Sequence, residues 1–107
     1  MIRGGLLLQK EIEEDCLKAL SAIGLYGFSV FCTPGKSAEE VYAAKKSLTL
    51  RYPEVRTAEV RQIRAIGLNL LPTLKSNHYT IEIMNPLDDS VFSHLDEVFS
   101  APVRMSR

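Results

Sequence analysis

The segment LKSNHYTIEIMNP, residues 74–86, carries the side chains best suited to chemistry. His78, Thr80 and Glu82 alternate along it with apolar residues, and a β-strand turns alternate side chains to one face of its sheet. Histidine titrates near neutral pH, so His78 is the candidate general acid or base. The Thr80 hydroxyl can bind a phosphate or orient the imidazole ring. His78 and Thr80 are therefore the candidate catalytic pair.

Side chains just upstream of this pair are candidates for binding phosphate. Arg61 and Arg64 lie three residues apart and so share one face of a predicted helix. Thr73 ends the next predicted strand, and Lys75 lies in the connection to His78. If the two strands form a hairpin, these groups converge. Arginines bind phosphate through paired hydrogen bonds and a histidine moves a proton, which together would equip a small metal-independent ribonuclease.

The same residues also fit a protein without a catalytic site. Arg61 and Arg64 can be solvated helix residues that pair with Glu54 or Glu59, and surface ion pairs of this kind are common and contribute little to stability. His78 would then face water on the exposed side of a sheet.

A single compact domain is expected to position these side chains, because the chain has 107 residues, 46% of them hydrophobic and 24% charged. Helices are predicted at about 9–23, 38–49, 57–66 and 89–100, and strands at about 27–32, around 55, 68–72 and 77–84. This order predicts an α+β fold with a single mixed sheet packed by helices on at least one face. Residues 101–107 are expected to fray unless a short strand forms at Val103.

Two segments give the most specific local predictions. SAEE, residues 37–40, matches a capping box, and the helix that it opens should turn Val41 and Ala44 inward and Lys45 outward. GFSVFC, residues 27–32, is apolar at nearly every position and predicts a strand buried on both faces.

Charge is distributed unevenly, although the formal net charge is zero. Residues 1–40 carry four basic and six acidic side chains, residues 41–81 carry seven and two, and residues 82–107 carry two and five. The basic middle can form a positive surface for phosphates, or the acidic ends can cancel it in three dimensions. The basic middle favours RNA binding, whereas the neutral total and the absence of tryptophan favour a protein-binding role.

Two resemblances involve the HYT triplet, residues 78–80. The triplet resembles the motif of the two-histidine phosphoesterases, but that family uses two such motifs, and the second histidine here lies in SHLDEV without a threonine or serine. A longer resemblance, from Leu6 to Leu95, rests on RAIGLNLLPT, residues 64–73, followed by HYT. It is similar to small uncharacterised bacterial proteins with an RxxG(L/F)xLLPT stretch before H(Y/F)T. Such proteins are often encoded as paired modules, which implies a toxin-like or antitoxin-like role.

Two classes of function are therefore expected. In the first, the chain is a cytoplasmic protein that binds or acts on RNA, as the toxin half of a pair. In the second, it is a non-catalytic partner that docks another protein chain or a second copy of itself.

No cofactor, metal or membrane contact is expected. Cys16 and Cys32 have no partner at disulfide or metal-ligand spacing and should be free, buried thiols. The leucines of residues 6–8 form an apolar run far shorter than a signal peptide or a membrane span requires, which predicts a cytoplasmic location.

Overall fold

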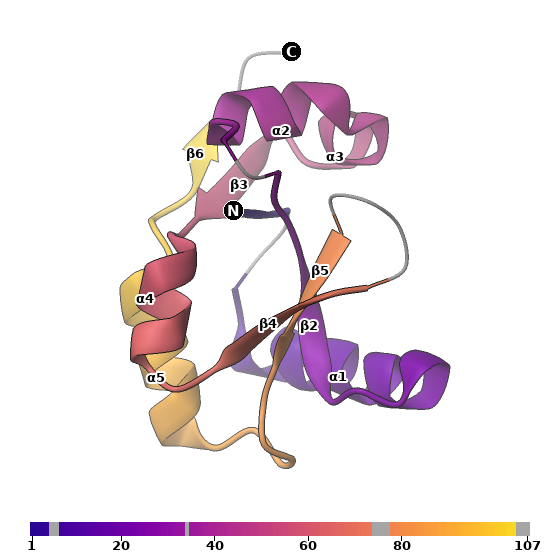
Figure 1. Cartoon of the computed structure of the whole chain (residues 1–107), viewed down its shortest axis with the longest axis vertical. Coiled ribbons are helices and arrows are strands. Elements are labelled where there is room, and N and C mark those ends of the chain that lie inside the picture. The colour runs from indigo at the N-terminus through magenta and orange to yellow at the C-terminus, as the bar shows by residue number, and fades with distance from the viewer. Residues whose placement is uncertain (5–6, 34, 74–77, 105–107) are drawn as a thin grey trace.

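The computed structural model describes residues 1–4, 7–33, 35–73 and 78–104. Its elements, in chain order, are β1 (Ile2–Gly4), α1 (Gln9–Ile23), β2 (Gly27–Phe31), α2 (Ala38–Ala44), α3 (Lys46–Arg51), β3 (Glu54–Thr57), α4 (Val60–Ala65), β4 (Asn69–Pro72), β5 (His78–Glu82), α5 (Asp89–Val98) and β6 (Val103–Arg104). The strands form one sheet in the order β4-β5-β2-β1-β3-β6. Helices α2 and α3 lie together at one end of the molecule, and α4 and α5 lie together along one side (Figure 1). The predicted α+β class is confirmed.

Every pair of neighbouring strands in this sheet is antiparallel, so the prediction of a mixed sheet is wrong. The cause is β1, which was not predicted. It pairs with both β2 and β3 and separates them, so these two strands run in the same direction without pairing. With only three residues, β1 is too short to show the alternation by which a strand is recognised.

Among the described residues, buried apolar side chains gather in two clusters. The larger cluster joins Phe28 of β2 and Ile81 of β5 to Ile12 of α1, Ile63 of α4 and Leu95 of α5. The smaller cluster lies under α2 and consists of Ile2, Val41, Tyr42 and Val55, with Phe31 and Tyr52 packed against it. Helices therefore pack on both faces of the sheet.

Strand β2 lies inside the sheet, between β5 and β1, as a core strand should. Phe28 and Val30 are buried, but Ser29 is exposed and Phe31 is half-buried. The prediction of burial on both faces is therefore wrong. The smaller cluster reaches Phe31 and stops there, so Ser29 stays uncovered.

The helix predicted over 38–49 is interrupted at Lys45, whose backbone is extended, and so becomes α2 and α3. Val41 is buried as expected, but Ala44 is exposed. Lys45, expected to point outward, is half-buried, and its Nζ lies 5.1 Å from the centre of the Phe31 ring. The break in the helix thus brings a lysine towards the sheet.

In the part of the chain that the structure describes, two helices begin with a capping box. Ser37 accepts a hydrogen bond from the Glu40 N–H at 3.2 Å, and the Glu40 carboxylate accepts one from the Ser37 N–H at 3.1 Å, which confirms the first box. Helix α4 was expected to be capped by Thr57, but that residue belongs to β3. Glu59 and Gln62 form the box of α4 instead.

The last part of the chain follows the prediction closely. Helix α5 covers most of the predicted 89–100, and Val103 forms a short strand opposite Val55 of β3. Residues 105–107 lie outside the described residues, as does the connection at 74–77. Among the helices that the structure describes, none has the length and apolar character needed to cross a membrane.

Candidate functional site

The hairpin expected to carry the catalytic pair is present. Strands β4 and β5 are antiparallel, and the Thr73 N–H donates a hydrogen bond to the His78 carbonyl at 3.0 Å. Three of the predicted site residues, Thr73, His78 and Thr80, are therefore neighbours in space. Thr80 is only 1% exposed, so the polar side of β5 is not simply a wet surface.

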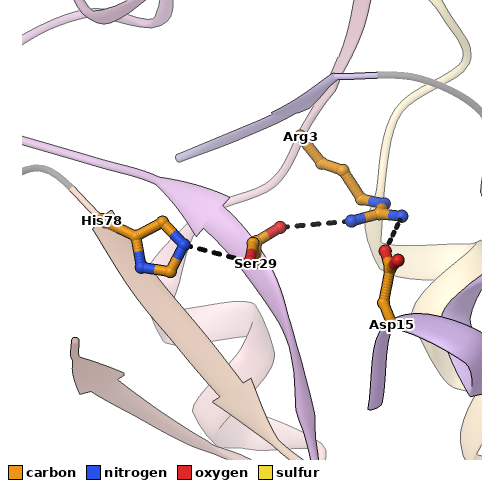
Figure 2. A network of polar contacts seen from close by, with 4 residues as sticks. All are labelled: Arg3, Asp15, Ser29 and His78. Atoms are coloured by element: carbon orange, nitrogen blue, oxygen red, sulfur yellow. Dashed lines mark hydrogen bonds and ion pairs between the residues drawn. The ribbon is translucent and has the colours of Figure 1, made fainter. Parts of the chain in front are cut away.

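A chain of four polar side chains runs across β2, β5 and the end of β4. The Nδ1 atom of His78 lies 2.8 Å from Oγ1 of Thr73, which lies 2.9 Å from Oγ1 of Thr80. On the other side of the ring, Nε2 lies 3.0 Å from Oγ of Ser29 (Figure 2). Both ring nitrogens of His78 therefore have a hydroxyl partner.

Ser29 is held in place through its backbone. Nη1 of Arg3 donates to the Ser29 carbonyl at 3.2 Å, and Nη2 of Arg3 donates to Oδ2 of Asp15 at 2.7 Å (Figure 2). Arg3 is 7% exposed, and a charge this deeply buried is tolerated only when it is paired. Through these two interactions Arg3 connects β1 to β2 and to α1, close to Ser29.

Two adjoining hollows open on this network. The first, of about 260 Å³, lies between α1 and the sheet, and its lining includes Lys18, Ser29, His78 and Thr80. The second, of about 290 Å³, is lined by Arg3, Gly4, Asp15, Ser29, Phe31, Arg51 and Tyr52. Asp15 and Ser29 line both hollows. A ligand in either hollow would therefore lie against Ser29.

The surroundings of His78 favour its neutral form. Partial burial lowers the pKa of His78, and the positive charge of Lys45 lowers it further. A hydrogen bond to the Thr73 backbone acts in the opposite direction without cancelling these effects. The Phe31 ring meets the imidazole edge-on, with 5.4 Å between the ring centres. At neutral pH the ring thus carries one proton, and its other nitrogen keeps a lone pair that can accept a second.

The arginines predicted to bind phosphate are not brought to His78 by any contact within the described residues. Arg61 and Arg64 are exposed on α4, which packs on α5 and β4 (Figure 1). Arg61 forms an ion pair with Glu59, as the non-catalytic alternative expected. The predicted Lys75 lies outside the described residues.

Other cations lie closer to the site and were not predicted from the sequence. Lys18 lines the first hollow and Arg51 the second, while Lys45 acts on His78 across Phe31. Ser29 was also missed. The signal for it was present, since a serine interrupts an otherwise apolar strand, but its neighbours in space depend on strand register, which the sequence did not reveal.

Within the described ranges, no group of three or more His, Cys, Asp or Glu side chains is placed to hold a metal ion. No protein-family model, curated protein or solved structure matches the chain. Function is therefore argued from the geometry of the site.

Proposed function

We propose that the protein acts on RNA, binding backbone phosphates at the two hollows and accepting a proton at His78, as the toxin half of a paired bacterial module. One observation carries the proposal. A half-buried imidazole lines a hollow, and hydroxyls stand at both of its nitrogens. A histidine placed in this way can accept a proton from an attacking hydroxyl.

The charges around the hollows suit a polyanionic substrate. Lys18, Lys45 and Arg51 contribute positive charge, and Asp15, the carboxylate that lines both hollows, is paired with Arg3. Guanidinium and ammonium groups bind phosphate oxygens through charge-assisted hydrogen bonds. Tyr52 and Phe31 add aromatic rings to the second hollow, and unpaired bases stack on such rings.

Binding is tested by titrating a fluorescent single-stranded RNA with the purified chain across a range of salt concentrations. Arg51→Ala and Lys18→Ala should each reduce the steepness of the plot of log affinity against log salt concentration by about 0.7. The reason is that a variant with one phosphate contact fewer releases fewer counterions from the RNA when it binds. Arg64→Ala, which removes an equally exposed arginine on α4, is the matched control and should change the slope less.

Cleavage is tested with the same RNA. His78→Asn should reduce the cleavage rate by roughly 100-fold or more while leaving affinity nearly unchanged, because a general base acts on the rate and not on binding. His94→Asn, at an exposed position of α5, is the control. If RNA does not bind even at low salt, where electrostatic attraction is strongest, the proposal fails and the protein-docking alternative takes its place.

A further inference from the structure

The pairing of β2 with β5 places a serine against the histidine. In this register Ser29 lies opposite Thr80, and Phe31 lies opposite His78. Ser29 and His78 are therefore diagonal neighbours on one face of the sheet, and their Oγ and Nε2 atoms are 3.0 Å apart. This is the separation found between a nucleophile and its base in enzymes that work through a serine.

The other ring nitrogen determines which atom of His78 can act as a base. Nδ1 faces the Thr73 hydroxyl at 2.8 Å, and that hydroxyl can accept a hydrogen bond from an Nδ1–H group. With Nδ1 donating to Thr73, the neutral ring keeps its lone pair on Nε2, directed at Ser29. Thr73 thus takes the orienting position that an acidic residue holds in a serine-histidine-aspartate triad.

Ser29 is also accessible and fixed, as a nucleophile must be. Its side chain is exposed and lines both hollows. Its carbonyl is held by the buried Arg3, which is itself paired with Asp15. The backbone at Ser29 is therefore restrained while its hydroxyl remains open to a substrate.

We propose that Ser29 is a nucleophile activated by His78, and that it attacks the phosphorus of phosphate diesters. This inference rests on the proposed function for its substrate and names the attacking group. The Oγ–P bond forms as the bond from phosphorus to the leaving alcohol breaks. The Ser29 proton passes to Nε2 of His78 and then to the leaving oxygen. Water then cleaves the Oγ–P bond, with His78 taking a proton from water and Ser29 regaining its own.

This step does not use the 2′-hydroxyl of RNA. Lys18 in the first hollow and Arg51 in the second lie where they can balance the negative charge on the phosphate. A substrate that lacks the 2′-hydroxyl should therefore also be cleaved, whereas a ribonuclease that activates the 2′-hydroxyl would leave it intact.

The test uses diisopropyl fluorophosphate and needs no RNA. Attack by Ser29 forms an Oγ–P bond, breaks the P–F bond and releases fluoride, and the proton goes to His78. Peptide mass spectrometry should find a single adduct, on Ser29, with none on Ser21, Ser90 or Ser93, which are also exposed. His78→Asn should slow labelling by roughly 100-fold or more, and Ser29→Ala should abolish it. Ser90→Ala is the control variant.

The dependence of the labelling rate on pH separates a chemical role of His78 from a structural one. This measurement uses the unmodified chain, so it does not require that a variant folds. The rate should fall at acidic pH as Nε2 becomes protonated, with a midpoint below the ordinary histidine pKa of 6.5. Thr73→Val should lower the rate and move that midpoint, which a purely structural role for Thr73 would leave in place.

Three results would overturn the inference. The first is the absence of an adduct on Ser29, and the second is an adduct that forms equally fast in His78→Asn. The third is undiminished RNA cleavage by Ser29→Ala, which would leave the proposed function standing. An adduct on Ser29 in a chain with no RNA affinity would support the nucleophile and overturn the proposed function instead.

Discussion

His78 depends on its neighbours in two ways, one geometric and one electrostatic. Thr73 and Ser29 hold the ring between two hydroxyls, and partial burial, together with the charge of Lys45, disfavours the charged ring. In the resting protein, a ring with these surroundings is poised to accept a proton at neutral pH. The lowered pKa of His78 therefore affects the stability of the fold as well as the chemistry of the site.

Folding stability should fall as the pH is lowered from about 6.5 through the folded pKa of His78. The folded pKa is lowered, so between the two values the unfolded chain binds more protons than the folded chain, and acid favours unfolding. Above 6.5 both states are neutral at this residue and the effect is absent. Urea denaturation at pH 7.5 and pH 5.5 measures how much the free energy of unfolding falls between these pH values. This fall should be smaller in the His78→Gln variant.

The matched control for this prediction is His94→Gln, which removes the other histidine of the chain from an exposed helix position. In this variant the free energy of unfolding should fall between the two pH values by nearly as much as in the unmodified chain. An equal decline in His78→Gln would contradict the assignment of the effect to His78.

At the scale of elements, the sequence predicted what depends on local chemistry. The bounds of α1, the capping box at Ser37 and the position of β5 all appear in the structure where they were expected, although Thr80 on the polar side of β5 is buried. These features arise from neighbours within about four residues in the chain. The hairpin of β4 and β5 also belongs to this group, because a short connection keeps the two strands together.

The rest could not be predicted, because it depends on contacts between residues far apart in the chain. Strand β1 is three residues long and is defined by its partners β2 and β3. The contact of Ser29 with His78 spans 49 positions and requires a particular register, since a slip of one residue would turn Ser29 to the other face. Lys45 contacts Phe31 from the point where the helix breaks, and the sequence did not predict that break.

The capping box at the start of α2 should contribute measurably to stability. Ser37→Ala removes the hydroxyl that accepts the Glu40 N–H and should lower the free energy of unfolding by about 1 kcal/mol, a common value for an N-cap serine. Chemical denaturation measures the change. Ser90→Ala, at an exposed position in the first turn of α5, is the control and should change stability less. An equal loss in both variants would show that the box contributes nothing specific.

At the scale of the whole molecule, the sheet joins two apolar clusters that lie on its opposite faces. The larger one gathers residues from α1, α4 and α5, and the smaller one lies under α2. The candidate site lies where the smaller cluster ends, because Ser29 is left uncovered beyond Phe31. The hollows thus occupy the part of the sheet that the packing of helices does not fill.

Cys16 lies within the larger cluster, and its reactivity should report the unfolding of the whole molecule. Its side chain is fully buried, and burial raises the pKa of the thiol to about 12, so the reactive thiolate is scarce in the folded chain. In a Cys32→Ser variant, iodoacetamide should label Cys16 only as urea unfolds the protein, with the midpoint seen by circular dichroism. A Cys16→Ala variant keeps the half-buried Cys32, which should react without denaturant. Rapid labelling of Cys16 in the native chain would mean that α1 opens locally, and the cluster would then not act as one cooperative core.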